Sequence, residues 1–333
     1  MRRRQFLGVL GGVAAGLAAS CPLAARAQQA DRIRRIGIFT PLVAGEPEAK
    51  IRIAAFLHGL EQLGWTVGRN LQIDYRWGGG NVEAIRKYSA ELAALAPDAI
   101  LATGSSTVGP LLQATRSVPI VFVVVPDPVG AGFVDSLARP GGNATGFIQF
   151  EYGISGKWLE LLKEIAPNLT RVAILRDAAI TAGTGQWGAV QSVAPALRLE
   201  IQPINLRNAT DIQRDIETFA RLPNGGMIVT GSALSVLHRA LFIELATRHK
   251  LPTIYFEQFF AKNGGLMSYG PNLVNQYRQA ATYVDRILKG EQASNLPVQT
   301  PTKYDLVINL KAAKDIGLTV PPTLLARADE VIE

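Results

Sequence analysis

Cysteine is almost absent from the chain: Cys21 is the only one in 333 residues. If the export signal described below is removed after Ala27, no thiol is left, which excludes disulfides, cysteine metal sites and thiol catalysis together. Histidine is also scarce, and its three residues match no catalytic motif. Neither a G-x-S-x-G nucleophile turn nor a phosphate-binding glycine loop occurs. We therefore expect a protein without catalytic residues, metal site or cofactor.

A basic stripe of the kind that binds nucleic acid is also missing. The net charge of +7 depends on four arginines within residues 1–27. Without these four, 30 basic residues stand against 27 acidic ones, a net charge of +3 that is scattered among residues of both signs. Binding to nucleic acid needs basic residues clustered on one face, so we expect no nucleic-acid partner.

Residues 1–27 have the pattern of a cleaved export signal. A basic start, MRRRQ, is followed by an apolar stretch from Phe6 to Ala19 and by small residues at Ala25 and Ala27. Arg3 and Arg4, followed by QFL, resemble the twin-arginine export motif, with the general secretory route as the alternative. The apolar stretch of about 14 residues is shorter than the roughly 20 that span a bilayer. We therefore predict cleavage near Ala27 and a periplasmic mature protein.

Short apolar runs alternate with segments of helical spacing along the rest of the chain. The first array has strand-like runs at 35–40, 71–75, 98–104 and 119–125, and a helical segment at 82–95. The run PIVFVVV is apolar throughout, as expected of a strand covered on both faces. A second array of the same kind has strand-like runs at 171–177, 199–206, 225–231 and 252–257. This alternation predicts an α/β fold of two lobes, each with a doubly wound parallel sheet.

Extended segments rich in glycine and proline lie between and after the two arrays, at 145–153, 265–272 and 296–304. We interpret them as three crossings between the lobes. The first lobe would then comprise residues 32–148 and 272–298, and the second lobe residues 149–271 and 299–333. A length of 333 residues is in keeping with two domains of ordinary size.

Ligands bind beyond the carboxyl ends of the strands in open parallel sheets. Polar residues directly after the apolar runs are therefore expected to line a cleft between the two lobes. The candidates are Thr40, Ser105, Ser106 and Asp127 in the first lobe, and Asp177, Ser232 and Glu257 in the second.

Two of these candidates allow a second interpretation. Ser105 and Ser106 precede a helix, so their hydroxyls either cap that helix or face an anionic group of a ligand. Asp127 lies between Pro126 and Pro128 at the end of the most apolar strand. Its carboxylate either meets a ligand ammonium or hydroxyl, or caps a helix that would begin near Ala131.

Three long stretches of the sequence are informative together: DPVGAGFVDSLARPGGNATG (127–146), GGLMSYGPNLVNQYRQAATYVDRILKG (264–290) and PTKYDLVINLKAAKDIGLTVPPTLLARADEVI (301–332). They resemble the ABC-transporter substrate-binding family that includes aromatic amino acid binding proteins. The resemblance implies a type I-like periplasmic binding protein with two lobes and three crossings. It also implies that Thr40, Ser105, Ser106 and Asp127 lie on the first-lobe wall of the cleft.

The leading functional hypothesis is a monomeric solute receptor that delivers a small polar or amino-acid-like molecule to an ABC permease in the inner membrane. A sensory subunit that presents its ligand to a membrane receptor would have the same sequence features. An exported α/β enzyme is a third possibility, but it would need a nucleophile, an acid–base pair or a metal cluster, and no such motif is found.

Overall fold

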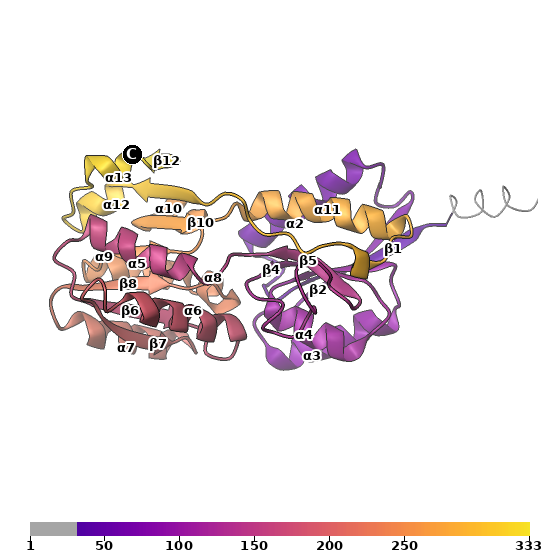
Figure 1. Cartoon of the computed structure of the whole chain (residues 1–333), viewed down its shortest axis with the longest axis horizontal. Helices are drawn as coiled ribbons and strands as arrows, with labels where there is room; N and C mark the ends of the chain where they lie inside the picture. The colour runs from indigo at the N-terminus through magenta and orange to yellow at the C-terminus, as the bar shows by residue number, and fades with distance from the viewer. Residues whose placement is uncertain (1–31) are drawn as a thin grey trace, which may run out of the picture.

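The computed structural model describes residues 32–333, which form two lobes side by side (Figure 1). Each lobe has its own sheet, of five strands in the first and seven in the second. The predicted α/β fold with two doubly wound lobes is confirmed. The predicted export signal lies outside the described residues. Within residues 32–333, no helix combines the length and apolar character needed to traverse a lipid bilayer.

The sheet of the first lobe has the strand order β2-β1-β3-β4-β5, and all neighbouring strands are parallel. Every residue of β3 is buried, because helices cover both faces of the sheet. The strands are β1 (Arg34–Thr40), β2 (Leu71–Trp77), β3 (Ala99–Thr103), β4 (Ile120–Val125) and β5 (Ala144–Ile148). The helices are α2 (Pro47–Gln62), α3 (Val82–Ala94) and α4 (Ser105–Ala114), with α11 (Leu273–Leu288) packed against α2.

The sheet of the second lobe has the order β12-β11-β10-β9-β8-β6-β7. Its strands are β6 (Arg171–Arg176), β7 (Glu200–Asn205), β8 (Gly225–Val229), β9 (Thr253–Tyr255), β10 (Met267–Gly270), β11 (Asp305–Asn309) and β12 (Glu330–Ile332). Its helices are α5 (Ile154–Ile165), α6 (Thr181–Val193), α7 (Ala209–Ala220), α8 (Ala233–Leu237), α9 (Arg239–Arg248), α10 (Gln258–Lys262), α12 (Leu310–Asp315) and α13 (Pro322–Leu325). The 3-10 helix η1 (Ala293–Asn295) follows α11.

One pair of strands in the second sheet is antiparallel, β10 with β11. The chain leaves this lobe at Gly270, the last residue of β10, and returns at Asp305, the first residue of β11. These two residues are partners in the register of the pair. Because the chain leaves and returns at the same edge of the lobe, the returning strand has to run in the opposite direction.

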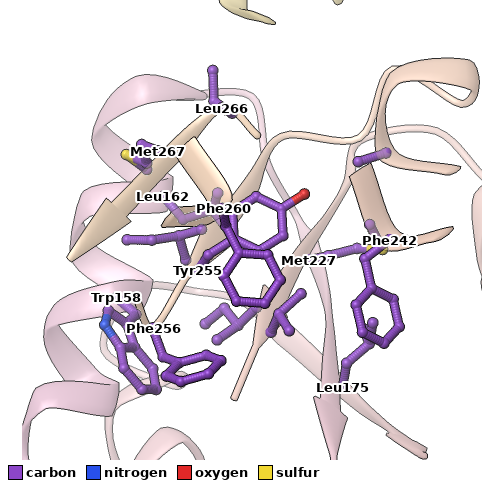
Figure 2. Packing of buried hydrophobic residues seen from close by; sticks show 14 of the residues in the cluster. Trp158, Leu162, Leu175, Met227, Phe242, Tyr255, Phe256, Phe260, Leu266 and Met267 are labelled. Atoms are coloured by element: carbon purple, nitrogen blue, oxygen red, sulfur yellow. The ribbon is translucent and has the colours of Figure 1, made fainter. Parts of the chain in front are cut away.

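The core of the second lobe fixes the end of β9, which leads into the space between the lobes. Tyr255 stacks on Phe260 with ring centroids 4.7 Å apart, and Phe256 meets Phe260 edge-on at 5.4 Å (Figure 2). The indole of Trp158, which is fully buried, donates a hydrogen bond of 2.7 Å to the carbonyl of Tyr269. Aromatic packing of this kind adds stability beyond the area that is buried, so the residue after Phe256 has a well-defined position.

Three segments connect the lobes: residues 149–153, 271–272 and 297–304. The third lies beside the end of β5, which leads into the first, because the amide of Ile148 donates to the carbonyl of Gln299, and the amide of Gln299 donates to the carbonyl of Gly146, each over 2.9 Å. The predicted lobe boundaries fall at or next to these segments and remain a prediction.

Three local expectations differ from the structure. The segments 145–153 and 265–272, both interpreted as crossings, contain most of β5 and all of β10, because a strand that ends at a crossing has the same extended, apolar pattern. The helix expected near Ala131 does not form; the residues after Asp127 make a series of turns instead, where the amide of Ala131 donates to the carbonyl of Asp127 over 3.1 Å. Glycines at 130 and 132 flank Ala131 and favour turns over a helix.

Candidate functional site

A pocket lies between the lobes at the carboxyl ends of strands from both sheets. This is the end of an open parallel sheet where ligands bind. Its free volume is about 60 Å³, room for about two water molecules. The first lobe contributes Pro41, Leu42, Arg52, Thr103, Gly104, Ser105, Ser106, Val124 and Pro126, and the rest of the lining is Gln149, Ile180, Ala182, Gly231, Ser232, Ala233, Val236, Phe256 and Glu257.

Four of the predicted site residues line this pocket: Ser105, Ser106, Ser232 and Glu257. Helix α4 begins at Ser105 after Gly104, and no side chain caps it, so the two hydroxyls do not take the capping role considered for them. Ser232 does cap α8, because its hydroxyl accepts a hydrogen bond from the amide of Ser235 over 3.1 Å. The structure thus brings these four residues together, while their contact with a ligand remains a prediction.

The other three predicted residues lie outside the pocket lining, and each is engaged by its own loop. The hydroxyl of Thr40 accepts from the amide of Leu42 over 3.3 Å. The carboxylate of Asp127 accepts from the amide of Gly130 over 2.7 Å, which closes a turn. The carboxylate of Asp177 accepts from the amide of Ala179 over 3.0 Å, and burial raises its pKa. Their roles toward a ligand also remain predictions.

A buried ion pair crosses the pocket between Arg52 of α2 and Glu257 at the end of β9. Their exposed fractions are 3% and 4%. One terminal nitrogen of Arg52 donates to Oε1 of Glu257, and Oε2 of Glu48 is 3.7 Å from the same nitrogen. Burial raises the pKa of Glu257 to about 7, although the charge of Arg52 acts in the opposite direction. The pair thus joins the two lobes with charges that have lost most of their water.

Three polar atoms of the pocket have no hydrogen-bond partner among residues 32–333. They are Nε of Arg52, Oε2 of Glu257 and Nε2 of Gln149, the residue that follows β5. Buried polar groups are nearly always hydrogen-bonded, because leaving one unpaired costs about 1–3 kcal/mol. Two N–H donors and one carboxylate oxygen without partners thus belong to residues that line the same pocket.

A second ion pair joins the lobes outside the pocket. Nη1 of Arg239 lies 2.8 Å from Oε2 of Glu46, the residue that caps α2. The other oxygen of Glu46 accepts from the amide of Glu48 over 3.5 Å, so both of its oxygens have partners. The two cross-lobe pairs share the same chemistry and differ in their access to the pocket.

The wall formed by the end of β4 is conformationally strained. Val124 has φ = 60°, a left-handed conformation that β-branched residues rarely adopt, and the pairing with β5 shifts register between Phe122 and Val125. Gln276 of α11 holds this bulge: its Oε1 accepts from the amide of Val124 over 2.9 Å and its Nε2 donates to the carbonyl of Ile148 over 2.7 Å. Strain of this kind concentrates at functional sites.

Arg52 and Gln149 are two polar pocket residues that were not predicted from the strand ends. The sequence contains a signal for Arg52. Its helical spacing places it on the buried face of α2, together with Ala49, Ile53 and Phe56. A charged residue on such a face needs a buried partner. Gln149 falls within a segment interpreted only as a crossing, and no local pattern distinguishes it.

The comparisons with known proteins agree with this architecture. The chain is similar to a tyrosine-binding protein of Clostridioides difficile (strain R20291), with 23% identity over 263 residues, or 79% of this chain and 75% of the relative. It is also similar to a solved ABC domain from Streptococcus pneumonia in complex with L-Trp, with a TM-score of 0.83, 21% identity, and coverage of 90% of this chain and 99% of that one.

A third similar structure is the ligand-free, open form of a substrate binding protein with adhesive properties from Clostridium difficile. It has 24% identity and the same coverage, 90% and 99%, but a TM-score of 0.65. The whole chain thus superposes better on the L-Trp complex than on the open form.

The sequence profile of one family, described as ABC transporter substrate binding protein, matches residues 40–332. This range includes both sheets, apart from most of β1, and all of the pocket. The resemblance drawn from three stretches of sequence is thereby confirmed, and the chain belongs to the ABC transporter substrate-binding protein family.

Proposed function

We propose that this protein binds an amino acid in the pocket between its lobes and delivers it to an ABC permease. The observation that carries the proposal is the set of buried, unpartnered polar atoms from both lobes on Arg52, Gln149 and Glu257. The tyrosine-binding relative and the L-Trp complex support an amino acid as ligand. Recognition without chemistry would also make the protein a receptor and not an enzyme.

Ligand entry requires the lobes to separate. Binding sites for small ligands measure roughly 300–1,000 Å³, whereas the pocket between the described lobes has about 60 Å³. The crossings at 149–153, 271–272 and 297–304 are the segments about which the lobes would move, because short extended strands absorb a hinge rotation more easily than packed helices. The lobes would then close again around the ligand.

A thermal-shift screen of the mature protein against the common amino acids tests this proposal. A ligand that binds only the folded protein stabilises it by about 2.7 kcal/mol at a hundredfold excess over Kd, which raises the melting temperature by several degrees. We expect L-tyrosine, L-tryptophan or another amino acid to produce such a rise. If every amino acid leaves the melting temperature unchanged, the proposal is wrong.

The predicted contacts outside the pocket lining are part of the proposal as well. Thr40, Asp127 and Asp177 would contact a larger ligand, or one bound with the lobes further apart. Asp127→Asn decides between the two roles considered for Asp127. A charge-assisted contact with the ligand is worth about 1.5–3 kcal/mol, so its loss weakens binding roughly ten- to a hundredfold. A residue that only closes its turn leaves the affinity unchanged, because asparagine accepts the same hydrogen bond from Gly130.

The cellular setting follows from the family and from the N-terminal sequence. We propose export to the periplasm, cleavage near Ala27 and a monomeric mature protein with the lobe boundaries given above and no nucleic-acid partner. Arg3 and Arg4 support the twin-arginine route. Replacing both by lysine is expected to leave the precursor in the cytoplasm, and unchanged export would indicate the general secretory route.

A further inference from the structure

Three side chains of the pocket offer hydrogen-bonding groups of different charge, and the function proposed above does not assign them to parts of the ligand. Arg52 offers an N–H donor on a positive group, Gln149 offers a neutral N–H donor, and Glu257 offers an acceptor on a negative group. We propose, resting on the function proposed above, that these residues select zwitterions: Glu257 binds the ammonium group of the ligand, and Arg52 and Gln149 together bind its carboxylate.

The charge of the pocket supports this assignment. Arg52 and Glu257 already neutralise each other inside a site from which most water is excluded. A ligand with a single charge brings an unbalanced charge into that site, and a buried charge without a partner is strongly unfavourable. A zwitterion adds one positive and one negative group and gives both Oε2 of Glu257 and Nε of Arg52 a charged partner.

The position of the three residues in the fold makes this selection depend on closure. Arg52 belongs to α2 of the first lobe, Glu257 follows β9 of the second, and Gln149 is the first residue after β5, in a crossing. The acceptor and the charged donor therefore face the same ligand only when the lobes approach each other. A ligand that lacks one of its charges can pair with the charged group of one lobe only, and it leaves the buried group of the other lobe unpaired. A polar site rejects a close analogue in this way.

The second cross-lobe pair provides a matched control. Arg239 and Glu46 form an ion pair of the same type between the same lobes, and Glu46 is as deeply buried as Glu257. Both oxygens of Glu46 already have partners, and neither residue lines the pocket. Removing the charge of Glu46 therefore perturbs closure without removing a group that faces the ligand.

Calorimetry with three matched probes tests the inference. L-Tyrosine carries both charges, tyramine lacks the carboxylate, and 3-(4-hydroxyphenyl)propanoate lacks the ammonium; the equivalent indole series is used if L-tryptophan binds more tightly. We expect the wild-type protein to bind the amino acid at least a hundredfold more tightly than either analogue. In Glu257→Gln the preference over the propanoate falls at least tenfold, and in Gln149→Leu the preference over tyramine falls at least tenfold.

The outcomes separate this inference from the proposed function. Glu46→Gln keeps the wild-type preferences even if all three affinities weaken together. Amino-acid binding with preferences unchanged in both Glu257→Gln and Gln149→Leu overturns the inference alone. If no probe of either series binds and no amino acid raises the melting temperature in the thermal-shift screen, the amino-acid function and the inference are both overturned. If Glu257→Gln does not fold, as judged by circular dichroism, Gln149→Leu decides, because it changes no charge.

Discussion

Gln276 is the residue that holds the strained wall of the pocket. Its side chain bonds the amide of Val124 and the carbonyl of Ile148, and it is itself buried. Leucine has a similar volume but can neither accept from Val124 nor donate to Ile148. Each backbone group left unpaired by that change costs about 1–3 kcal/mol.

We therefore predict that Gln276→Leu lowers the free energy of unfolding by about 2–6 kcal/mol and weakens ligand binding, because Val124 is released from its strained conformation. Urea unfolding measures the first effect and calorimetry the second. Gln279→Leu is the control, since Gln279 lies on the exposed face of the same helix. Equal stability of the two variants would show that the bulge does not depend on Gln276.

How far the site could be predicted from the sequence also depends on particular residues. Ser105, Ser106, Ser232 and Glu257 were found because the carboxyl ends of strands in a parallel sheet meet at one edge. Arg52 was missed because it lies in a helix, and its partner Glu257 is 205 residues away. Such a pairing is set by the angle between the lobes, which no local pattern encodes.

At the level of elements, the crossings are constrained by close backbone contacts. Gly270 ends β10 at the second crossing, and a Cβ atom at this position would lie 2.0 Å from the carbonyl oxygen of Phe256. Phe256 and Glu257 both line the pocket. Glycine at 270 is therefore what allows β10 to approach the segment that carries Glu257.

We predict that Gly270→Ala lowers the free energy of unfolding by more than about 2 kcal/mol, because overpacking against backbone forces the chain to shift. It should also reduce ligand affinity by displacing Glu257. Chemical denaturation and calorimetry give the two values. Gly188→Ala in α6 is a suitable control: its Cβ meets nothing within 4 Å, so a gain of roughly 0.5–1 kcal/mol in stability is expected. A stable Gly270→Ala variant with normal affinity would contradict the steric argument.

The elements themselves were predictable to within a few residues where a strand is covered on both faces. The runs at 119–125 and 171–177 form β4 and β6, because a short apolar run is typical of a strand that helices cover on both faces of a parallel sheet. The direction of β11 and the extent of β5 were not predicted. Both depend on where the chain passes between the lobes, and a strand and a crossing share the same extended pattern.

For the whole molecule, closure is linked to the protonation of Glu257. Between closed lobes, burial and the nearby carboxylates of Glu48 and Glu46 raise the pKa of this group to about 7, against the effect of Arg52. When the lobes separate, water reaches Glu257 and its pKa returns toward the ordinary value of 4.5. Between these two pH values the closed form binds a proton that the open form does not bind. Closure without ligand is therefore favoured as the pH falls below about 7, and it is lost as the pH rises through that value.

We predict that the radius of gyration of the ligand-free protein is smaller at about pH 5.5 than at about pH 8, and small-angle scattering measures it. Because one group titrates, the ratio of closed to open protein changes by at most about tenfold per pH unit. Glu257→Gln removes this dependence, whereas Glu46→Gln keeps it, because Glu257 still titrates.

Ligand binding is expected to depend on pH in the opposite direction from ligand-free closure. A ligand ammonium requires the carboxylate form of Glu257, so ligand affinity should fall as the pH drops below the pKa of Glu257 in the ligand-free protein, which lies between 4.5 for the open form and about 7 for the closed form. At about pH 8, where ligand-free closure is weakest, saturating amino acid should therefore produce its largest decrease in the radius of gyration. A ligand affinity that rises on acidification, in a protein whose ligand-free lobes also close on acidification, would show that the ligand meets the protonated form of Glu257 and so carries no ammonium group at that position.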